Sequence, residues 1–262
     1  MRTRSEKVAL ITGASIGIGK DLAELFAANG HDVVLVARNQ ANLEALAKHL
    51  QDAHGVIAHV VPLDLSIAGA ADRLMEMVSQ RNLPIEFLVN NAGFGTHGPF
   101  AKSELSDELE MIQVNIAALT HLTRLVLPAM LARRSGRIMN LASVAGFMPG
   151  PYMSVYYATK AYVRSFSEAI ASEVAGSGVT VTSVCPGPTL TGFQKRAGVE
   201  NSPLFNNNTM KSSDVARIGY DAMMHGRRSI TTGFKNKMIG VASRLMPRAA
   251  LAGIAKRLNA KR

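Results

Sequence analysis

Short, β-branched apolar segments alternate with helical segments along most of this chain. The apolar segments are nearly continuous runs, as strands buried on both faces of a sheet are. Helical segments between such strands predict βαβ units. We therefore expect a doubly wound α/β fold, in which helices cover both faces of one parallel sheet. The expected strands are 8–12, 32–37, 56–61, 85–90, 137–141, 179–184 and 229–231, and the expected helices are 18–28, 40–52, 68–81, 104–132 and 153–175.

The domain organisation follows from the length and from one break in this pattern. A chain of 262 residues suits a single α/β domain, so 1–262 is predicted to be one domain. Residues 186–211 interrupt the alternation with prolines, glycines and the run Asn206–Asn208. A loop this long inside a compact domain is usually functional, so this segment is predicted to be a lid over a substrate site.

The first expected strand leads into a glycine-rich turn, residues 12–19, which opens the first expected helix. Glycines let the backbone approach a pyrophosphate closely, and a helix N-terminus offers unpaired N–H groups and the positive end of a dipole. A plain tight turn does not readily account for glycines at positions 13, 17 and 19. The turn therefore predicts a dinucleotide site. The expected contacts are Thr12, Gly13, Ser15, Ile16, Gly17 and Gly19.

The turn has the spacing T-G-x-x-x-G-x-G, and further motifs follow it along residues 8–191. In chain order they are Asn90-Asn91-Ala92-Gly93, Asn115, Ser143, Tyr156-x-x-x-Lys160, and Pro186-Gly187 with Thr191. This set resembles the short-chain dehydrogenase/reductase family. The resemblance implies a Rossmann-type NAD(P)-binding catalytic domain. It also implies cofactor contacts from Asn91, Ala92, Gly93, Tyr156, Lys160, Pro186, Gly187, Thr189 and Thr191.

The end of the second expected strand indicates which cofactor binds. NAD-selective sites usually place Asp or Glu there to bind the ribose 2′-hydroxyl. This strand instead ends Val36-Ala37-Arg38, and a guanidinium pairs with a 2′-phosphate that a carboxylate would repel. Arg38 therefore predicts NADP(H), against the alternative of an ordinary surface arginine. Many NADP-using relatives also carry a basic residue in the glycine turn, where this chain has Ile16, so Arg38 is expected to act largely alone.

Asp64 and Leu65 follow the third expected strand. By the family resemblance, Asp64 contacts the adenine and Leu65 lies beside it in the cofactor site. The alternative for Asp64 is an aspartate that caps the next turn.

Tyr156 and Lys160 form the expected centre of the chemistry. Hydride transfer to a ketone leaves an alkoxide that needs a proton, and a tyrosine phenol supplies one. The ordinary phenol pKa is about 10, and a nearby cation lowers it toward the working range. The two residues are four apart and share one helical face, whereas Tyr152 and Tyr157 have no such lysine partner. The alternative is that Tyr156 only packs an amphipathic helix.

Two further residues complete the expected catalytic set. Ser143 is expected to hydrogen-bond the substrate carbonyl and the developing oxyanion, although a lone serine at a strand end otherwise indicates a turn or cap. By resemblance, Asn115 would hold a water that connects Lys160 to solvent. Lys160 would also hydrogen-bond the nicotinamide ribose, while the nicotinamide supplies the hydride.

Together these residues predict NADPH-dependent reduction of a ketone or aldehyde, or the reverse oxidation of an alcohol. The alternatives are a 3-oxoacyl-carrier-protein reductase and a non-catalytic NADP(H) sensor, which would have no need of a proton donor. The expected substrate-facing loops are apolar, which favours an apolar substrate, although such residues equally suit packing of the lid. These residues are Phe94, Phe100, Phe147, Met148, Pro149, Tyr152, Met153, Phe193, Leu204 and Phe205.

The net charge of +10 resides in the C-terminal segment, residues 222–262. No acidic residue follows Asp221, so residues 1–221 are formally neutral. This segment could simply form a solvated basic face or a helix that packs on the core. The alternative is that it makes a weak contact with an anionic membrane surface or with an acidic carrier. No nucleic-acid-binding module is recognisable, so no nucleic-acid partner is expected. Apolar residues at helical spacing in this segment are Met238, Val241, Leu245, Leu251, Ile254 and Leu258.

The remaining expectations concern location and assembly. Cys185 is the single cysteine and lies in an apolar strand, so we expect a buried hydrophobe and a cytoplasmic protein. No uninterrupted apolar run of about 18 residues predicts a membrane span. The histidines lack metal-ligand spacing, so no metal is expected, and His97 is predicted to be a solvated loop residue. By resemblance, the helices 104–132 and 153–175 would form a homodimer or homotetramer interface.

Overall fold

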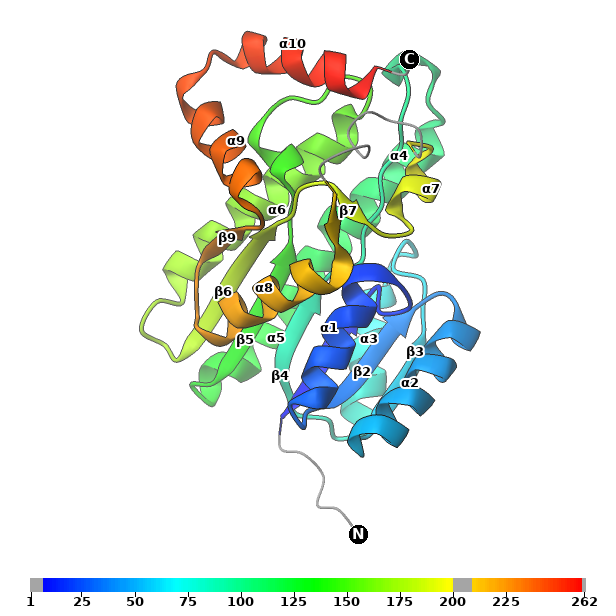
Figure 1. Cartoon of the computed structure of the whole chain (residues 1–262). Coiled ribbons are helices and arrows are strands. Elements are labelled where there is room, and N and C mark those ends of the chain that lie inside the picture. The colour runs from blue at the N-terminus through cyan, green and yellow to red at the C-terminus, as the bar shows by residue number, and fades with distance from the viewer. Residues whose placement is uncertain (1–6, 200–208, 261–262) are drawn as a thin grey trace.

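The computed structural model describes residues 7–199 and 209–260. Seven strands form one sheet in the order β3-β2-β1-β4-β5-β6-β9 (Figure 1). All neighbouring strands in this sheet are parallel, which confirms the doubly wound Rossmann-type α/β fold. The strands are β1 (Val8–Thr12), β2 (Asp32–Ala37), β3 (Ala58–Pro62), β4 (Ile85–Asn90), β5 (Gly136–Leu141), β6 (Val179–Cys185) and β9 (Ser229–Thr231).

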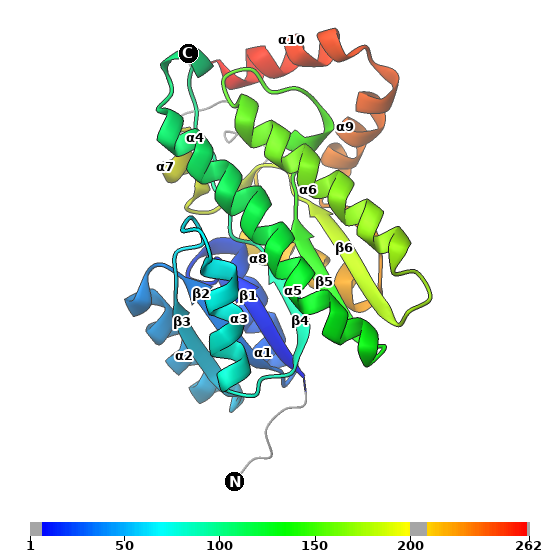
Figure 2. The same ribbon diagram turned by 180° about the vertical axis from the view of Figure 1, so that it is seen from behind.

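Helices cover both faces of this sheet (Figures 1 and 2). One core cluster joins the first face to α1, α2 and α8, and a second joins the other face to α3, α5 and α6. This two-sided cover is why the strands are apolar on both faces. The helices are α1 (Gly17–Ala28), α2 (Gln40–His54), α3 (Ala70–Gln80), α5 (Leu119–Ala132), α6 (Ser154–Glu173) and α8 (Ser212–Met224).

The shorter elements lie mainly around the carboxyl ends of the strands. Helices α7, α9 and α10 sit at the end of the molecule opposite the N-terminus (Figure 1). These elements are η1 (Phe100–Lys102), α4 (Leu105–Ile112), η2 (Gln113–Ala118), η3 (Val144–Phe147), β7 (Thr189–Leu190), α7 (Phe193–Ala197), β8 (Met210–Lys211), α9 (Phe234–Leu245) and α10 (Arg248–Asn259).

The structure differs from the sequence-based expectation at several element ends and within two longer segments. Strand β3 begins two residues late, at Ala58, because its register starts opposite Val33 of β2. The expected helix 104–132 is interrupted by a π-helical stretch, η2, which contains Asn115. The expected loop 186–211 contains β7, α7 and β8, so part of it is regular, while residues 200–208 lie outside the described residues. Its role as a lid stays a prediction.

One continuous helical stretch is long and apolar enough to cross a membrane by length and composition alone. It runs from Leu105 to Ala132, with a mean hydropathy of 1.4, and 39% of its most apolar window is buried. It lies along the sheet in Figure 2, where α5 contributes to the core. The same features are common in a core helix of an α/β domain.

Phe26 of α1 ties three elements together on one face of the sheet. Its side chain is fully buried. Its ring centroid lies 5.1 Å from that of Phe87 on β4 and 5.0 Å from that of Tyr220 on α8. Aromatic contacts of this kind add to the free energy already gained from burial.

Phe26→Ala is therefore expected to lower the free energy of unfolding by about 3–5 kcal/mol, because it removes a large buried ring and leaves a cavity. The matched control is Phe100→Ala on η1, an exposed ring whose loss should change stability by less than about 0.5 kcal/mol. Urea unfolding of both variants measures the difference. Equal losses from the two substitutions would contradict this account of the core.

Candidate active site

The glycine turn is shaped to hold a phosphate-bearing ligand. Gly13 has φ 65° and Gly17 has φ 56°, both in the left-handed region that favours glycine. A Cβ on Gly19 would overlap the carbonyl oxygen of Gly13 and the amide of Asn91. Helix α1 begins at Gly17, and no side chain caps its N-terminus. The backbone N–H groups there therefore remain available to an anion such as a dinucleotide pyrophosphate.

Thr12 holds this turn beside the Asn-Asn-Ala-Gly segment. Its hydroxyl donates to the carbonyl oxygen of Val89 at 3.2 Å and accepts from the N–H groups of Asn91 and Ala92, each at 3.0 Å. The Asn91 side-chain amide donates to the Thr12 carbonyl oxygen at 2.9 Å. Thr12 therefore acts by positioning the ends of β1 and β4.

Arg38 lies just past the end of β2, as expected, with its side chain half exposed. Its guanidinium Nη1 lies 3.8 Å from Asp64 Oδ2 and 3.5 Å from Glu110 Oε1. Asp64 also accepts hydrogen bonds from the Ser66 N–H at 2.9 Å and hydroxyl at 2.8 Å. Asp64 thus caps a turn, as one sequence-based reading predicts, and also lines the cavity, whereas its contact with the adenine stays a prediction.

The charge of Asp64 is stabilised by its surroundings. Burial raises the pKa of its carboxyl, but the hydrogen bonds from Ser66 and the charges of Arg38 and Arg196 outweigh burial and hold the pKa below its ordinary value. Arg196, on α7, also reaches Glu110 Oε1 at 3.4 Å and lies over the Phe94 ring at 4.6 Å. Sequence reasoning missed both Arg196 and Glu110, because neither belongs to a motif.

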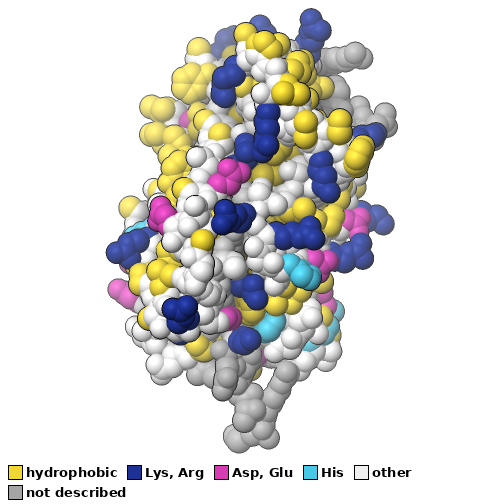
Figure 3. All heavy atoms as spheres, turned by 90° about the vertical axis from the view of Figure 1, so that its left-hand side faces the viewer, with side chains coloured by type: hydrophobic (Ala, Val, Ile, Leu, Met, Phe, Trp, Pro, Cys, Tyr) yellow, Lys and Arg dark blue, Asp and Glu magenta, His cyan; other side chains and the backbone are white. Residues whose placement is uncertain are grey.

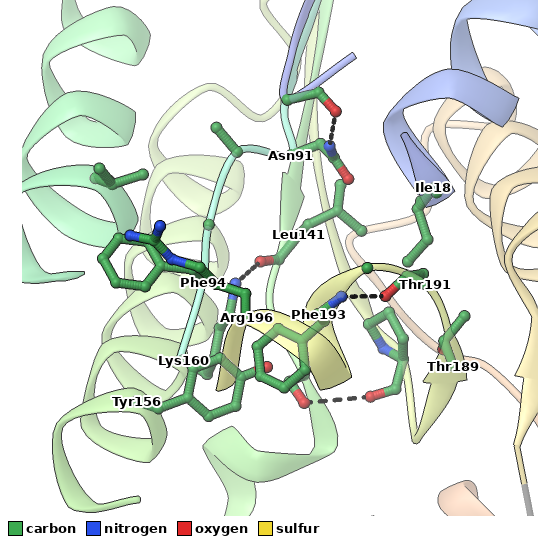
Figure 4. Close-up of a pocket in the computed structure, with 18 of the residues that line it drawn as sticks. Ile18, Asn91, Phe94, Leu141, Tyr156, Lys160, Thr189, Thr191, Phe193 and Arg196 are labelled. Carbon is green, nitrogen blue, oxygen red and sulfur yellow. Dashed lines mark hydrogen bonds between the residues drawn. The ribbon is translucent and has the colours of Figure 1, made fainter. Parts of the chain in front are cut away.

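Tyr156 and Lys160 project from α6 into the same cavity (Figure 4). The Tyr156 ring packs against Phe193 of α7, with centroids 5.1 Å apart. Lys160 Nζ donates to the Leu141 carbonyl oxygen at 2.7 Å and lies 5.8 Å from the centre of the Tyr156 ring. The i, i+4 spacing therefore brings phenol and ammonium together at the end of β5, as the sequence predicts.

The pKa of the Tyr156 phenol differs from the sequence-based expectation. Lys160 was expected to lower it; instead burial raises the pKa above its ordinary value, and a hydrogen bond with Ser143 only partly opposes this. Burial also lowers the pKa of the Lys160 ammonium to about 8. Desolvation disfavours the charged form of each group, which explains the opposite directions. At neutral pH the phenol is protonated and most of the lysine is cationic.

Ser143 follows β5 and lines the cavity. Its hydroxyl accepts from the Ala145 N–H at 3.1 Å, which caps η3, and donates to the Pro186 carbonyl oxygen at 3.3 Å. The cap reading is therefore confirmed, and the expected hydrogen bond from Ser143 to a substrate carbonyl stays a prediction. Through Pro186, Ser143 is also joined to the segment that carries Pro186-Gly187.

Asn115 is buried in η2 and fastens the loop after β4. Its Oδ1 accepts from the Phe94 N–H at 3.1 Å, and its Nδ2 donates to the Phe94 carbonyl oxygen at 3.0 Å and to Thr159 Oγ1 at 3.1 Å. A π-helical stretch often marks a functional site. Here it presents the Asn115 amide to the backbone beside Gly93. The expected water beside Asn115 stays a prediction.

A single cavity of about 710 Å³ brings most of the predicted site residues together. Three predicted residues do not line the cavity but contact residues that do. They are Thr12, Gly19 and Asn115. Among the described residues, no three His, Cys, Asp or Glu side chains group where they would hold a metal ion. The predicted residues that line the cavity are Gly13, Ser15, Ile16, Gly17, Arg38, Asp64, Leu65, Asn91, Ala92, Gly93, Ser143, Tyr156, Lys160, Pro186, Gly187, Thr189 and Thr191.

The predicted substrate-facing residues divide into three groups. Phe94, Met148, Met153 and Phe193 line the cavity. Leu204 and Phe205 lie outside the described residues. The prediction is wrong for Phe100, Phe147, Pro149 and Tyr152, which do not line the cavity.

Three of these exclusions have a structural reason. The Phe100 side chain is exposed to solvent. Phe147 packs on the cluster of Leu119 and Val163, with the Arg164 guanidinium over its ring. Tyr152 lies at a left-handed backbone position, φ 69°, beside His97.

The C-terminal helices supply cavity residues that sequence reasoning missed. Asn236 and Ile239 of α9 and Leu258 of α10 line the cavity. Helix α10 is held over it by Asn259, whose Nδ2 donates to the Pro151 carbonyl oxygen at 2.9 Å. His97 was predicted to be solvated, but its Nε2 lies 2.6 Å from the Asn259 carbonyl oxygen, and the side chain is partly buried. These contacts span more than a hundred residues, so no local pattern indicates them.

A dinucleotide cradle and a Ser-Tyr-Lys set in one cavity define an oxidoreductase of the Rossmann class. Residues 7–201 match the family model described as short chain dehydrogenase. The chain therefore belongs to the short-chain dehydrogenase/reductase family, as its motifs predict.

Three known proteins illustrate the similarity. The chain is 37% identical over 187 residues to "Ketoacyl reductase HetN" of Nostoc sp.. The match covers 71% of this chain but only 65% of that relative, which is less than two thirds of its length. A short-chain dehydrogenase from Sphingobium yanoikuyae in complex with NADPH has a TM-score of 0.82 at 33% identity, covering 96% of this chain and 94% of that one. A family member from Burkholderia phymatum in complex with NAD has a TM-score of 0.80 at 28% identity, covering 94% of both chains.

The buried ammonium of Lys160 should destabilise the protein, and the effect should depend on pH. The lysine pKa is about 8 in the fold and 10.5 in the unfolded chain, so the unfolded chain binds more protons between these values. Stability should therefore rise with pH across that window and carry the full penalty below it. Lys160→Met removes the charge at similar volume. We expect it to stabilise the cofactor-free protein by about 3 kcal/mol at pH values below the window, with the gain shrinking inside it.

Urea unfolding at neutral pH and inside the window checks this prediction. Lys102→Met, at an exposed lysine on η1, is the matched control and should show no such gain. A gain from Lys160→Met that is independent of pH would contradict the assigned cause.

Proposed function

We propose that this oxidoreductase uses NADPH to reduce the carbonyl of an apolar ketone. The observation that carries the proposal is one cavity that holds a protonated, partly buried tyrosine at one end and an arginine beside the glycine turn at the other. The phenol suits donation of a proton, and the arginine suits a 2′-phosphate.

In the proposed reaction each site residue has a separate task. The nicotinamide, when bound, supplies the hydride. Tyr156 donates its phenol proton to the carbonyl oxygen, which becomes the alcohol. Ser143 donates a hydrogen bond to the same oxygen as negative charge develops on it. The Lys160 cation favours the phenolate left on Tyr156, which then regains a proton from solvent.

The substrate end of the cavity supports an apolar ketone. Its lining beyond Ser143 and Tyr156 is formed by hydrophobic side chains from six elements or loops. They are Phe94, Met148, Met153, Phe193, Val199, Ile239 and Leu258. A 3-oxoacyl thioester is a second candidate, favoured by the exposed cations of the C-terminal helices and by the ketoacyl reductase named among the relatives. A non-catalytic sensor is disfavoured, since binding alone needs neither Ser143 nor a protonated Tyr156.

Two further expectations stay predictions. The homodimer or homotetramer would use the face of α4, α5 and α6, where Leu105, Leu109 and Tyr162 are exposed. A cytoplasmic location accords with the single buried cysteine, Cys185, whose thiol has a pKa raised by burial.

Tyr156→Phe tests the proposed proton donor. The substitution keeps the ring and removes the hydroxyl, so kcat should fall at least about 100-fold, while the Kd for NADPH stays near that of the wild type. The measurement is NADPH consumption over a panel of 3-oxoacyl, steroid and aromatic ketones, together with NADPH fluorescence titration. Tyr162→Phe, on the same helix but outside the cavity, is the control and should keep full activity. A fully active Tyr156→Phe enzyme, or no turnover of any carbonyl by the wild type, would defeat the proposal.

Arg38→Ala tests the choice of cofactor. The guanidinium offers a charge-assisted contact to the 2′-phosphate, but Asp64 and Glu110 compete for it. We therefore expect kcat/KM with NADPH to fall about 10- to 30-fold, the lower part of the range for such contacts, and kcat/KM with NADH to change little. Arg217→Ala, at an exposed arginine on α8, is the control. An unchanged cofactor ratio, or a wild type that already prefers NADH, would show that Arg38 does not select the cofactor.

A further inference from the structure

Helix α9 turns an apolar stripe toward solvent. Phe234, Met238, Val241 and Leu245 recur at four-, three- and four-residue spacing, so they share one side of the helix. Their exposed fractions are 78%, 54%, 55% and 82%. We call these four residues the α9 stripe. Asn236 is the one buried residue of the helix. A core-packing helix would have the reverse arrangement.

The opposite side of α9 is fixed on the body of the protein. Gly240 lies against the Phe147 ring, so closely that an added Cβ would come within 3.1 Å of it. The Asn236 amide donates to the Thr232 carbonyl oxygen at 2.7 Å. Because small and polar residues form this contact, rotation of α9 to bury the stripe would break it. The stripe is therefore a stable feature of the surface.

Cations surround the stripe. Figure 3 shows hydrophobic and Lys or Arg side chains together at the end of the molecule that carries α9 and α10. Within residues 209–260, no acidic residue follows Asp221, and none of the cations of these two helices forms an ion pair with a described residue. All of them are exposed. They are Lys235, Lys237, Arg244, Arg248, Lys256 and Arg257.

The positive charge around the α9 stripe indicates which kind of partner can cover this surface. A second copy docked on the same face by two-fold symmetry would bring the same cations together. An acidic protein carrier would meet the cations, but it leaves unexplained an apolar row about 16 Å long, at 1.5 Å per residue. An anionic bilayer satisfies both features, because an interfacial helix buries its apolar face at the boundary of headgroups and acyl chains while its cations contact the lipid charges.

We propose that α9 and α10 dock this protein on an anionic membrane surface, with the α9 stripe inserted below the headgroups. Ile239 and Leu258, on the same two helices, line the cavity. Docking would therefore bring an apolar part of the cavity close to the bilayer, where a lipophilic substrate concentrates. That consequence rests on the proposed function, but the docking itself involves no catalytic step.

Co-sedimentation with vesicles tests the proposal without any substrate. The wild type should sediment with vesicles of equal parts phosphatidylcholine and phosphatidylglycerol, bind pure phosphatidylcholine much less, and dissociate as salt is added. Phe234→Glu with Leu245→Glu should weaken partitioning at least about tenfold, because two exposed apolar side chains lose their burial in the bilayer. Ile57→Glu with Ile67→Glu adds the same charge at exposed apolar residues elsewhere and should keep most of the binding.

A second variant, Met238→Gln with Val241→Gln, removes apolar surface without adding charge and should also weaken binding. Circular dichroism melting checks that each variant folds. The proposal is overturned if the wild type does not sediment with anionic vesicles, or if both glutamate pairs weaken binding equally. It is overturned as well if an acidic acyl carrier protein binds where vesicles do not, or if the stripe variants only abolish self-association. NADPH-dependent turnover, measured separately, leaves this result unaffected.

Discussion

The parallel pairing of β1 with β4 fixes the relative position of nearly everything in the cavity. Leu10 pairs with Leu88 and Ile11 with Val89, so the two strands end side by side. The Thr12 hydroxyl then accepts from two N–H groups of the segment after β4. On one side of this junction lie the glycine turn and β2; on the other lie β5 and β6. Doubly wound sheets bind ligands at this change of direction, and a slip of one residue would reverse the faces of a strand.

Burial then sets the charge state of the two central side chains. The cavity wall desolvates both the Tyr156 phenol and the Lys160 ammonium. Desolvation raises the pKa of the phenol and lowers the pKa of the ammonium, so it favours the neutral form of each group. For the phenol this means a retained proton, and the lysine, with a pKa of about 8, stays mostly cationic at neutral pH. A proposed reduction needs this combination, because the proton must be present before transfer and the cation afterwards. The buried ammonium lowers the free energy of unfolding, and it is present because the proposed chemistry needs it and not because the fold does.

The parts of the structure that sequence could predict are those with local causes. The strands and the helices of the sheet layers follow from apolar periodicity, and the glycine turn and Tyr156–Lys160 follow from spacing along one element. The errors lie where distant segments meet. The pKa of Tyr156 depends on burial by α7, and the exclusion of Phe147 from the cavity depends on Arg164 and α9. Arg196 and Glu110 meet across 86 residues of sequence, so no spacing indicates their pairing.

The C-terminal helices show why one amphipathic pattern has two readings. Hydrophobic spacing identifies a helical face but does not say whether that face turns inward or outward. In α9 the inward side is chosen by Asn236 and Gly240, which fit against Thr232 and Phe147 more closely than any large side chain would. In α10 the inward side is chosen by Leu251 and Asn259. The two helices are therefore held by different chemistry, and the outward face of α9 is left apolar as a result of how its inward face packs. Substitutions on the stripe can then alter the surface without altering the cavity, which keeps the proposed docking and the proposed catalysis experimentally separable.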